Sequence, residues 1–252
     1  MTTLSAELLE QVRLGVFDRL VEKDVLDWAF TQLGNNVALA TSFSLEDMVV
    51  LDMIQAVKPR AAVFTLDTGR LHQETYLVMD QVRSRYGIDV EVYCPDGTEL
   101  EALMRAKGPN SFYDSVAARQ ECCHIRKVEP LSRALAYRDG WVTGRRAQQA
   151  VTRLSLPTVE VDEAHGSILK INPIVHWSLE QVWAYIKEQK LPYNRLYDHG
   201  YQSIGCAPCT RAILPGENER SGRWWWENPE QKECGIHVQP RSGSGLPGNA
   251  KT

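Results

Sequence analysis

Six cysteines could do chemistry in this chain, and four of them fall into two close pairs. Cys122 and Cys123 are adjacent, whereas Cys206 and Cys209 form a Cys-x-x-Cys sequence on a turn that contains Pro208. The first ten residues hold two Glu and no basic residue, and read as neither a signal peptide nor a transit peptide. Without a secretion signal, paired cysteines are typical of metal or redox chemistry rather than of disulfides.

Two kinds of metal group take four cysteine ligands, a single zinc ion and a [4Fe–4S] cluster. Structural zinc sites usually place two to four residues between paired ligands, whereas Cys122 and Cys123 are neighbours. Neighbouring side chains on a helix point about 100° apart, so they converge poorly on one ion and better on the several iron corners of a cluster. The spacing therefore favours the cluster and leaves zinc as the alternative.

Cys234 stands apart from these pairs, in the sequence Lys-Glu-Cys-Gly-Ile-His. An isolated thiol on a flexible arm suits a nucleophile better than a metal ligand. Arg220, Arg223 and His237 are near it in the sequence, and cations lower the pKa of a thiol from about 8.5. Since no further cysteine follows Cys234, a covalent intermediate on its sulfur would require an external thiol for its release. The sixth cysteine, Cys94, is interpreted as a small residue at the end of a predicted strand, without a chemical role.

Arginines gather after the predicted strands and near the cysteines. Planar guanidinium groups bind phosphate and sulfate through paired hydrogen bonds, so the set predicts a ligand with several negative charges. Lys127, four residues after Cys123 on a regular helix, adds a cation on the same face. The arginines are Arg145, Arg146, Arg153, Arg211, Arg220 and Arg223.

The first strand-to-helix turn, residues 41–47, is a candidate contact for such a ligand. It follows the apolar run at 37–40, and Ser42 lies within it. Free N–H groups at a helix N-terminus suit a phosphate, although Ser44 to Asp47 also fits an ordinary capping box. The Lys of a Walker loop is absent, which argues against ATP hydrolysis of that type.

The second such turn is Asp67-Thr68-Gly69, directly after the apolar run at 61–66. Gly69 permits a tight turn, and Asp67 or Thr68 could contact a ribose or cap the next helix. Because both turns follow strands of the same predicted sheet, we expect them at the same edge.

The elements that position these residues alternate between short apolar runs and segments of helical period, which predicts a mostly parallel α/β sheet. Helical period ends at 216, so we expect one domain at 1–215 and a mobile C-terminal segment at 216–252. Predicted strands are 37–40, 61–66, 89–93, 141–143 and 168–171; predicted helices lie in 4–31, 45–56, 71–82 and 119–128, from Pro130 onward and in 179–186.

Charge and hydropathy exclude other classes. The net charge of −4 argues against a surface that binds nucleic acid. No apolar run approaches the roughly 18 residues that a membrane span needs. We therefore expect a cytoplasmic protein without a nucleic-acid or membrane partner, and the sequence leaves open whether it forms a homo-oligomer.

Together, these motifs resemble the assimilatory adenylylsulfate (APS) reductases, relatives of the phosphoadenylylsulfate (PAPS) reductases. The resemblance runs from about Leu33 to His237. The cysteine pairs mark the APS branch, because the cluster-free PAPS enzymes lack them. The motifs that carry it are Leu66-Asp67-Thr68-Gly69-Arg70, the Cys-Cys-x-x-Arg-Lys of 122–127, Gly205-Cys-Ala-Pro-Cys-Thr-Arg211 and Lys232-Glu-Cys-Gly-Ile-His237.

The resemblance implies a doubly wound, adenine-nucleotide α-hydrolase-like fold. It implies a [4Fe–4S] cluster on Cys122, Cys123, Cys206 and Cys209, with Cys234 as the catalytic nucleophile. It further implies an oxidoreductase of sulfate assimilation and cysteine biosynthesis, which converts adenylylsulfate to sulfite and AMP through a Cys234 S-sulfonate with thioredoxin, or glutaredoxin, as reductant.

The same resemblance assigns the phosphosulfate to Lys127, Arg220, Arg223 and one arginine within 145–153. Many members have Gly-Ala-Glu-Asp where this chain has Ser44-Leu-Glu-Asp, and without that Gly the backbone approaches a ligand less closely. The full set of predicted substrate contacts is Ser42, Asp67, Thr68, Gly69, Lys127, Arg145, Arg146, Arg153, Arg220, Arg223 and His237.

Three alternatives remain at this point. The substrate could be the 3′-phosphorylated nucleotide, PAPS, alone or together with adenylylsulfate. A cluster-dependent tRNA thiolase of the same fold would be expected to carry a Ser-Gly-Gly-Lys-Asp loop, which residues 42–47 are not. A metal-binding redox sensor without catalysis would bind metal yet consume no adenylylsulfate.

Overall fold

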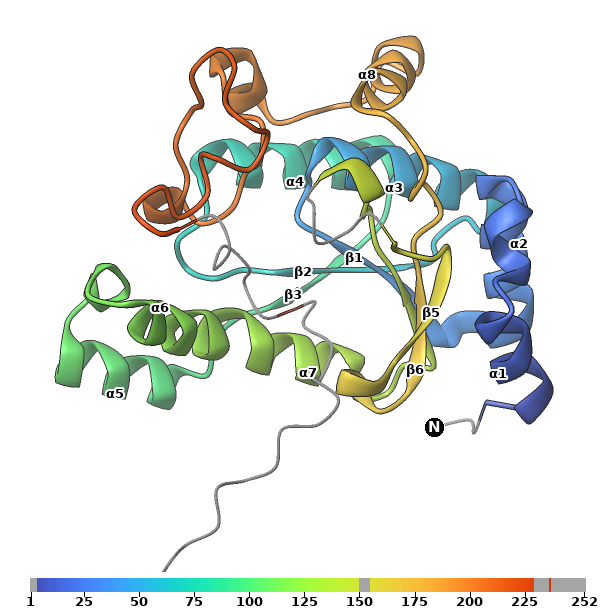
Figure 1. Cartoon of the computed structure of the whole chain (residues 1–252), viewed down its shortest axis with the longest axis horizontal. Helices are drawn as coiled ribbons and strands as arrows, with labels where there is room; N and C mark the ends of the chain where they lie inside the picture. The colour runs from blue at the N-terminus through green and yellow to red at the C-terminus, as the bar shows by residue number, and fades with distance from the viewer. Residues whose placement is uncertain (1–3, 150–154, 229–235, 237–252) are drawn as a thin grey trace, which may run out of the picture.

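The centre of the molecule is a six-stranded sheet in the order β3-β2-β1-β4-β6-β5, seen in a computed structural model that describes residues 4–149, 155–228 and 236 (Figure 1). Neighbouring strands run parallel except β5, which is antiparallel to β6. The predicted site residues Arg153, Cys234 and His237 lie outside the described residues. The strands are β1 (Val37–Thr41), β2 (Ala62–Leu66), β3 (Val90–Tyr93), β4 (Gly140–Val142), β5 (Val159–Asp162) and β6 (Ile168–Ile171).

Helices cover both faces of the sheet, with α3 and α4 above it and α5 to α7 below it in Figure 1. A π-helical turn, η4 (His124–Val128), separates α6 from α7. The α-helices of the described residues are α1 (Ala6–Arg13), α2 (Glu22–Leu33), α3 (Leu45–Val57), α4 (Gln73–Tyr86), α5 (Gly97–Lys107), α6 (Val116–Cys123), α7 (Glu129–Leu135) and α8 (Leu179–Glu188).

Successive residues of the central strands enter opposite cores, because side chains alternate along a strand. Leu39 of β1 packs in the larger core with residues of α2 and α3, whereas its neighbour Ala38 packs in the smaller core with Leu131 and Leu135 of α7. This double burial is typical of parallel strands that are apolar throughout.

The predicted alternation of strands and helices is confirmed. Ser44 and Ser178 close the predicted capping boxes of α3 and α8, and Pro130 lies in the first turn of α7. Three elements among the strands, α-helices and π-helices were not predicted: the antiparallel edge strand β5, helix α5 and the π-helical turn η4. Because of that turn, the predicted helix 119–128 is α-helical only as far as Cys123.

The strand order creates a crevice at one edge of the sheet. Strand β1 has β2 on one side and β4 on the other, so the chain leaves the ends of neighbouring strands in opposite directions. Open α/β sheets bind ligands at such a switch point, beyond the carboxyl ends of the strands.

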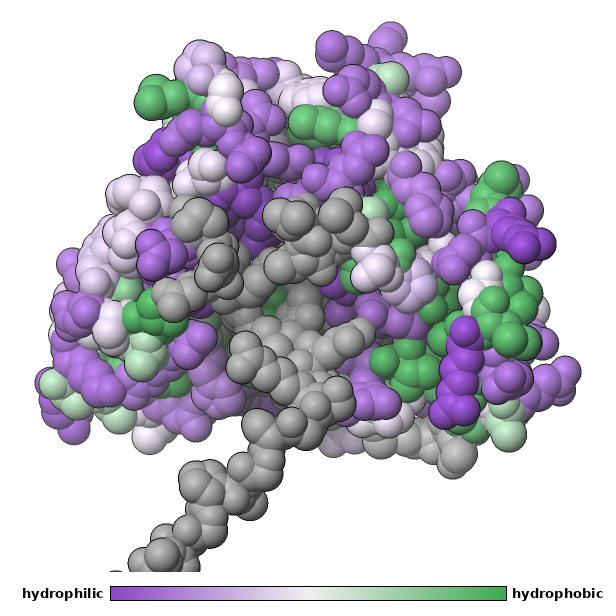
Figure 2. All heavy atoms as spheres, viewed as in Figure 1, coloured by the Kyte–Doolittle hydropathy of each residue, from purple (hydrophilic) through white to green (hydrophobic). Residues whose placement is uncertain are grey.

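The surface and the helices give two further observations. In Figure 2, several of the apolar side chains on the viewed face lie over α1 and α2. Leu14, Val16, Leu20 and Val21, between these two helices, are exposed. None of the helices in the described ranges is long and apolar enough to cross a lipid bilayer.

Candidate active site and cysteine centre

A cavity of about 210 Å³ lies at the switch point. Its walls come from residues after β1, β2 and β4, from segment 202–206 and from two arginines, Arg220 and Arg223. Ile236, the last residue that the structure describes, also lines it and packs on the smaller core. The position of the cavity, beyond the carboxyl ends of the strands, is the one at which open α/β sheets bind ligands.

The turn between β1 and α3 is fastened by its own side chains. The Asp47 carboxylate accepts hydrogen bonds from the backbone N–H (2.7 Å) and hydroxyl (2.8 Å) of Ser42 and from the N–H of Ser44 (3.4 Å). The Tyr197 hydroxyl accepts the N–H of Leu45 at 3.4 Å. These N–H groups, expected to be available to a phosphate, are therefore already bonded, and the turn is the capped one that the sequence left as the alternative. Ser42 lines the pocket and stays a predicted contact.

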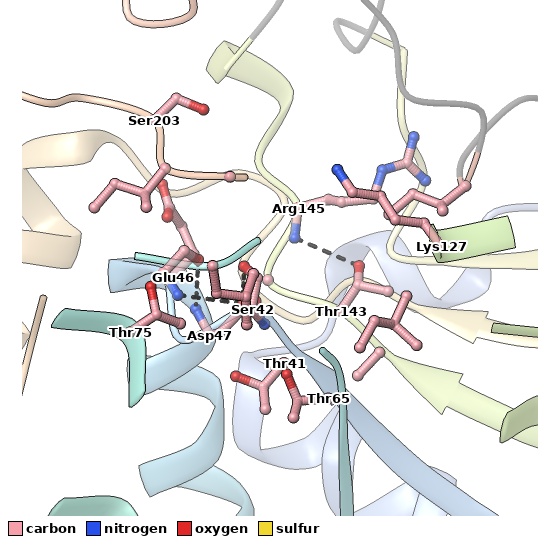
Figure 3. Close-up of a pocket in the computed structure, with 18 of the residues that line it drawn as sticks. Thr41, Ser42, Glu46, Asp47, Thr65, Thr75, Lys127, Thr143, Arg145 and Ser203 are labelled. Carbon is pink, nitrogen blue, oxygen red and sulfur yellow. Dashed lines mark hydrogen bonds between the residues drawn. The ribbon is translucent and has the colours of Figure 1, made fainter. Parts of the chain in front are cut away.

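Charge is divided between the walls of the pocket. Glu46 and Asp47 lie on one side in Figure 3, and Lys127 and Arg145 lie on the other. Burial raises the pKa of Asp47, although hydrogen bonds from Ser42 act in the opposite direction. An anionic group of a ligand is therefore attracted to the side of Lys127 and Arg145, and a neutral group fits better beside the acids.

The adjacent Arg145 and Arg146 have different surroundings. Arg145 lines the pocket, and its Nη1 donates to Glu160 at 2.7 Å. Arg146 is fully buried behind the pocket lining, where its guanidinium binds Glu46 at 2.8 Å and Glu219 at 3.1 Å. Arg146 thus links α3, the segment that follows β4 and the segment that carries Arg220. Its role as a substrate contact stays a prediction.

Arg223 passes directly over the backbone of Gly205. A Cβ at position 205 would overlap the guanidinium of Arg223, so this approach requires a glycine. The guanidinium also lies 4.7 Å from the ring centroid of Trp224, and Arg119 lies 4.7 Å from the same ring. Arg119 in turn forms a buried ion pair with Glu227 at 2.8 Å.

The Asp67-Thr68-Gly69 turn connects the pocket to the cysteines. Asp67 accepts hydrogen bonds from the N–H of Gly69 (2.8 Å) and from the hydroxyl of Tyr76 (2.9 Å). Burial and this carboxylate raise the pKa of Tyr76 to about 12. Thr68 lines the pocket, whereas Asp67 and Gly69 do not. The Thr68 hydroxyl accepts a hydrogen bond from the Cys206 thiol at 3.3 Å.

The four paired cysteines line one small hollow, as their sequence spacing predicts. Cys122 and Cys123 are the last residues of α6, where the chain enters the π-helical turn, a feature that is frequent at functional sites. None of the five cysteines that the structure describes forms a disulfide. Cations and apolar groups complete the walls of the hollow; these residues are Arg70, Phe112, Arg119, Arg126, Lys127 and Pro208.

The thiols of the hollow differ in acidity. Burial raises the pKa of Cys209 to about 12 and also raises that of Cys122. Burial raises the pKa of Cys206 as well, but the charge of Lys127, a hydrogen bond that the Thr68 hydroxyl donates to the thiolate form, and the charges of Arg223 and Arg126 outweigh it, so the net shift is downward. Lys127 and Cys206 line both the hollow and the pocket, and the two sites therefore share a wall.

Two buried donor atoms near this hollow have no acceptor among the residues that the structure describes. Trp224 packs with the cysteines, and its buried indole N–H has no hydrogen-bond partner within the described ranges; the same is true of Nε of Arg126. Cations and unpaired N–H groups around four thiols fit an anionic, sulfur-rich group. In the part of the chain with described coordinates, no three His, Cys, Asp or Glu side chains are arranged to hold a single metal ion.

Several polar residues of the pocket were not predicted. Thr65 and Thr143 stand at or just after the ends of β2 and β4, as Thr41 does at the end of β1. A polar residue at the carboxyl end of a buried strand is a signal that the sequence contains. Glu219 and Ser203 lie in irregular segments and Tyr197 in a short 3-10 helix, η8 (Arg195–His199), and none of them carries such a signal. The unpredicted residues are Thr65, Thr75, Thr143, Gln149, Tyr197, Gln202, Ser203 and Glu219.

Comparison with known proteins identifies the family. Residues 36–212 match the phosphoadenosine phosphosulfate reductase domain. An adenosine 5′-phosphosulfate reductase from Allochromatium vinosum is 50% identical over 84% of this chain and 84% of its own length. The structure of a PAPS reductase from Candida auris, in complex with phosphate, superposes with a TM-score of 0.70 at 33% identity, over 84% of this chain and 99% of that one.

More distant structures share only the fold. Yeast FAD synthetase superposes with a TM-score of 0.55 at 13% identity, over 84% of this chain and 70% of its own. This likeness confirms the predicted adenine-nucleotide α-hydrolase-like architecture. The match over residues 36–212 and the 50% identity to the Allochromatium vinosum enzyme establish that the chain belongs to the phosphoadenosine phosphosulfate reductase family.

Proposed function

We propose that this chain reduces adenylylsulfate to sulfite and AMP in assimilatory sulfate reduction. The observation that carries the proposal is the wall shared by two sites. Lys127 and Cys206 border both the pocket at the switch point and a hollow lined by four cysteines. A relative named adenosine 5′-phosphosulfate reductase is 50% identical to the chain, whereas the PAPS reductase of known structure is 33% identical. This difference favours the nucleotide without a 3′-phosphate.

The distribution of charge supports one orientation of the nucleotide. The phosphosulfate carries the negative charges, so it binds beside the cations that line the pocket, which are Lys127, Arg145, Arg220 and Arg223. The adenosine occupies the side of Ser42 and the acids. The sulfuryl group then lies near the wall that the pocket shares with the cysteines.

Cys234 is the proposed nucleophile, although it lies outside the described residues. Ile236 lines the pocket, and residues two apart in a chain are separated by at most about 7 Å between their Cα atoms. The Cys234 thiolate attacks the sulfur of the sulfuryl group, the bond from that sulfur to the phosphate oxygen breaks, and AMP leaves. Cations beside the sulfuryl oxygens stabilise the charge that develops there. Cys234 now carries an S-sulfonate.

A dithiol protein, thioredoxin or glutaredoxin, completes the reaction in this proposal. One of its thiolates attacks the Cys234 sulfur, sulfite departs with the electron pair of the S–S bond, and a mixed disulfide forms. The second thiol of the reductant releases Cys234 as a thiolate. The sulfuryl sulfur is reduced by two electrons, and the dithiol is oxidised to a disulfide.

The four cysteines of the hollow suit a [4Fe–4S] cluster, held by Cys122, Cys123, Cys206 and Cys209. Such a group would supply a fixed local charge distribution beside the substrate. Within the chain, Lys127 faces both sites, and its ammonium group offsets negative charge from the thiolates and from the sulfuryl oxygens.

Two other features stay predictions. One is a boundary at residue 215; the described part of the segment beyond it is joined to the rest by the Glu219–Arg146 and Glu227–Arg119 ion pairs. The other is the cytoplasmic location.

Product analysis with both nucleotides tests the proposed function. Anaerobically purified protein is supplied with thioredoxin, its reducing system and equal concentrations of adenylylsulfate and PAPS, and sulfite, AMP and adenosine 3′,5′-bisphosphate are measured. We expect sulfite and AMP in equal amounts, with little bisphosphate. Predominant bisphosphate would assign the chain to PAPS reduction, and metal binding without either product would favour the non-catalytic sensor.

A further inference from the structure

Arg145 is held at the pocket wall by a closed set of hydrogen bonds that reaches the outermost strand of the sheet. Its Nη1 donates to Oε1 of Glu160 at 2.7 Å, and the side-chain amide of Asn172 donates to the same oxygen at 3.3 Å. The Thr143 hydroxyl donates to Oδ1 of Asn172 at 2.6 Å and accepts the backbone N–H of Arg145 at 3.4 Å. Thr143 and Arg145 line the pocket, whereas Glu160 and Asn172 lie behind it. Figure 3 shows the bond between Arg145 and Thr143.

The sheet register places a cation beside Glu160. Glu160 on β5 is paired with Lys170 on β6, and Lys170 is paired with Trp141 on β4. The Lys170 ammonium lies 3.7 Å from Oε1 of Glu160 and 4.8 Å from the centroid of the Trp141 ring, which lines the pocket. All three side chains are buried. Asp162, two residues after Glu160 on β5, accepts the indole N–H of Trp141 at 3.0 Å.

Glu160 therefore does more than attach the edge strand β5 to the sheet, because it also restricts the Arg145 side chain. A long arginine side chain loses rotamer freedom when it binds a ligand, and a side chain that is already fixed loses less. The Glu160 carboxylate fixes Arg145, and Lys170 offsets part of the negative charge that the carboxylate would otherwise set against an anion. The arrangement leaves a fixed guanidinium on the basic side of the pocket.

We propose that Glu160 is a positioning residue for nucleotide binding, which holds the Arg145 guanidinium toward the anionic group of the nucleotide. This role rests on the proposed function, since it requires that the pocket binds an adenine nucleotide. Glu160 acts through Arg145 and does not touch the ligand itself. Strand β5, which the sequence did not predict, thereby contributes to the site from the outer edge of the sheet.

Binding of AMP and of adenosine to the full chain, measured by calorimetry, tests this role. The variants are Glu160→Gln, Arg145→Ala and the double variant. Glu160→Gln retains the shape of the side chain but removes its charge from a buried ion pair, so urea unfolding is measured alongside to show that each variant is folded. We expect it to weaken AMP binding about fivefold and to leave adenosine binding unchanged, because only AMP carries the anionic group. In the Arg145→Ala background it should have no further effect on AMP.

The control is Glu91→Gln on β3, at the opposite edge of the sheet. It removes the charge from the ion pair that Glu91 forms with Arg138 at 2.6 Å. It should leave both affinities unchanged. The proposal is overturned if Glu160→Gln leaves AMP binding unchanged, weakens AMP and adenosine equally, or weakens AMP further without Arg145. Failure of the unmodified chain to bind AMP would contradict the proposed function itself, and this role with it.

Discussion

The guanidinium of Arg223 lies where a Cβ at position 205 would be. Gly205 directly precedes Cys206 of the cysteine hollow, and Arg223 lines the nucleotide pocket. A single glycine therefore sets how closely a cation of the pocket approaches the segment that carries the cysteines. This relationship makes the proposed site testable by a small change.

Gly205→Ala should displace Arg223 while the fold is retained, because the overlap is with the end of a flexible side chain and not with backbone. If Arg223 binds the phosphosulfate, the KM for adenylylsulfate rises about tenfold, the effect of losing one charge-assisted hydrogen bond. Steady-state kinetics and a thermal melt measure both effects. Gly97→Ala is the control, since a Cβ at Gly97 meets open space. An unchanged KM for Gly205→Ala would contradict the role of Arg223.

Replacement of any one cysteine of the hollow by serine should abolish cluster assembly. We expect about four iron atoms and four sulfides per chain in the unmodified protein purified without oxygen. In Cys122→Ser, Cys123→Ser, Cys206→Ser and Cys209→Ser, the iron content should fall to background. The control is Cys94→Ser, at an exposed position outside the hollow, which should keep its full iron content. One zinc ion per chain, or iron lost from the control, would refute this assignment.

Glu227→Gln should destabilise the chain strongly, because Glu227 forms a buried ion pair with the guanidinium of Arg119. Loss of one partner from a buried pair costs about 3 kcal/mol in the free energy of unfolding. Glu121→Gln breaks the exposed pair with Lys107 and should cost less than about 1 kcal/mol. Urea unfolding of both variants gives the comparison. Equal losses would mean that burial of the Arg119 pair has no energetic consequence.

The contribution of Asp162 to stability should disappear in acid. Burial raises its pKa, but hydrogen bonds from His165 and Trp141 and the charge of Lys170 outweigh this, so the folded-state pKa is below the ordinary value of 3.8. A carboxyl group whose pKa is lower in the folded chain than in the unfolded chain stabilises the fold fully at pH values above its unfolded-state pKa. This stabilisation is lost as the pH falls through the folded-state pKa.

Asp162→Asn should therefore lower the free energy of unfolding by about 1–3 kcal/mol at neutral pH, the range for a buried group that loses its partner. The difference from the unmodified chain should stay constant down to about pH 5 and shrink below about pH 4. Urea titrations across this range measure it. A difference that grows in acid would have the wrong sign for a depressed pKa.

Local patterns in the sequence were sufficient for most strands and helices of the fold. Short apolar runs marked the parallel strands, and the serines before α3 and α8 marked the starts of those helices. Strand β5 was missed although Val159 and Val161 alternate with Glu160 and Asp162, a period typical of a half-buried strand. In the structure both carboxylates are buried as well, Glu160 beside Arg145 and Lys170 and Asp162 beside Trp141 and His165.

Sequence proximity was a weaker guide to the pocket. Arg145 and Arg146 are adjacent, yet the guanidinium of Arg146 is bound by Glu46 and Glu219, 100 and 73 residues away. Long-range ion pairs of this kind leave no local signal. The cysteine pairs could be predicted to meet because a metal group needs several thiolates. The π-helical turn that follows Cys123 depends on tertiary packing and could not.

The central claim is that Cys234 carries the sulfonate. Intact-protein mass spectrometry tests it most directly, after incubation with adenylylsulfate in the absence of any thiol, followed by peptide mapping. We predict one sulfonate group per chain, on Cys234, with AMP released in equal amount and the sulfonate lost as sulfite when thioredoxin is added. A chain that stays unmodified, or a Cys234→Ser variant that still produces sulfite, would contradict the account.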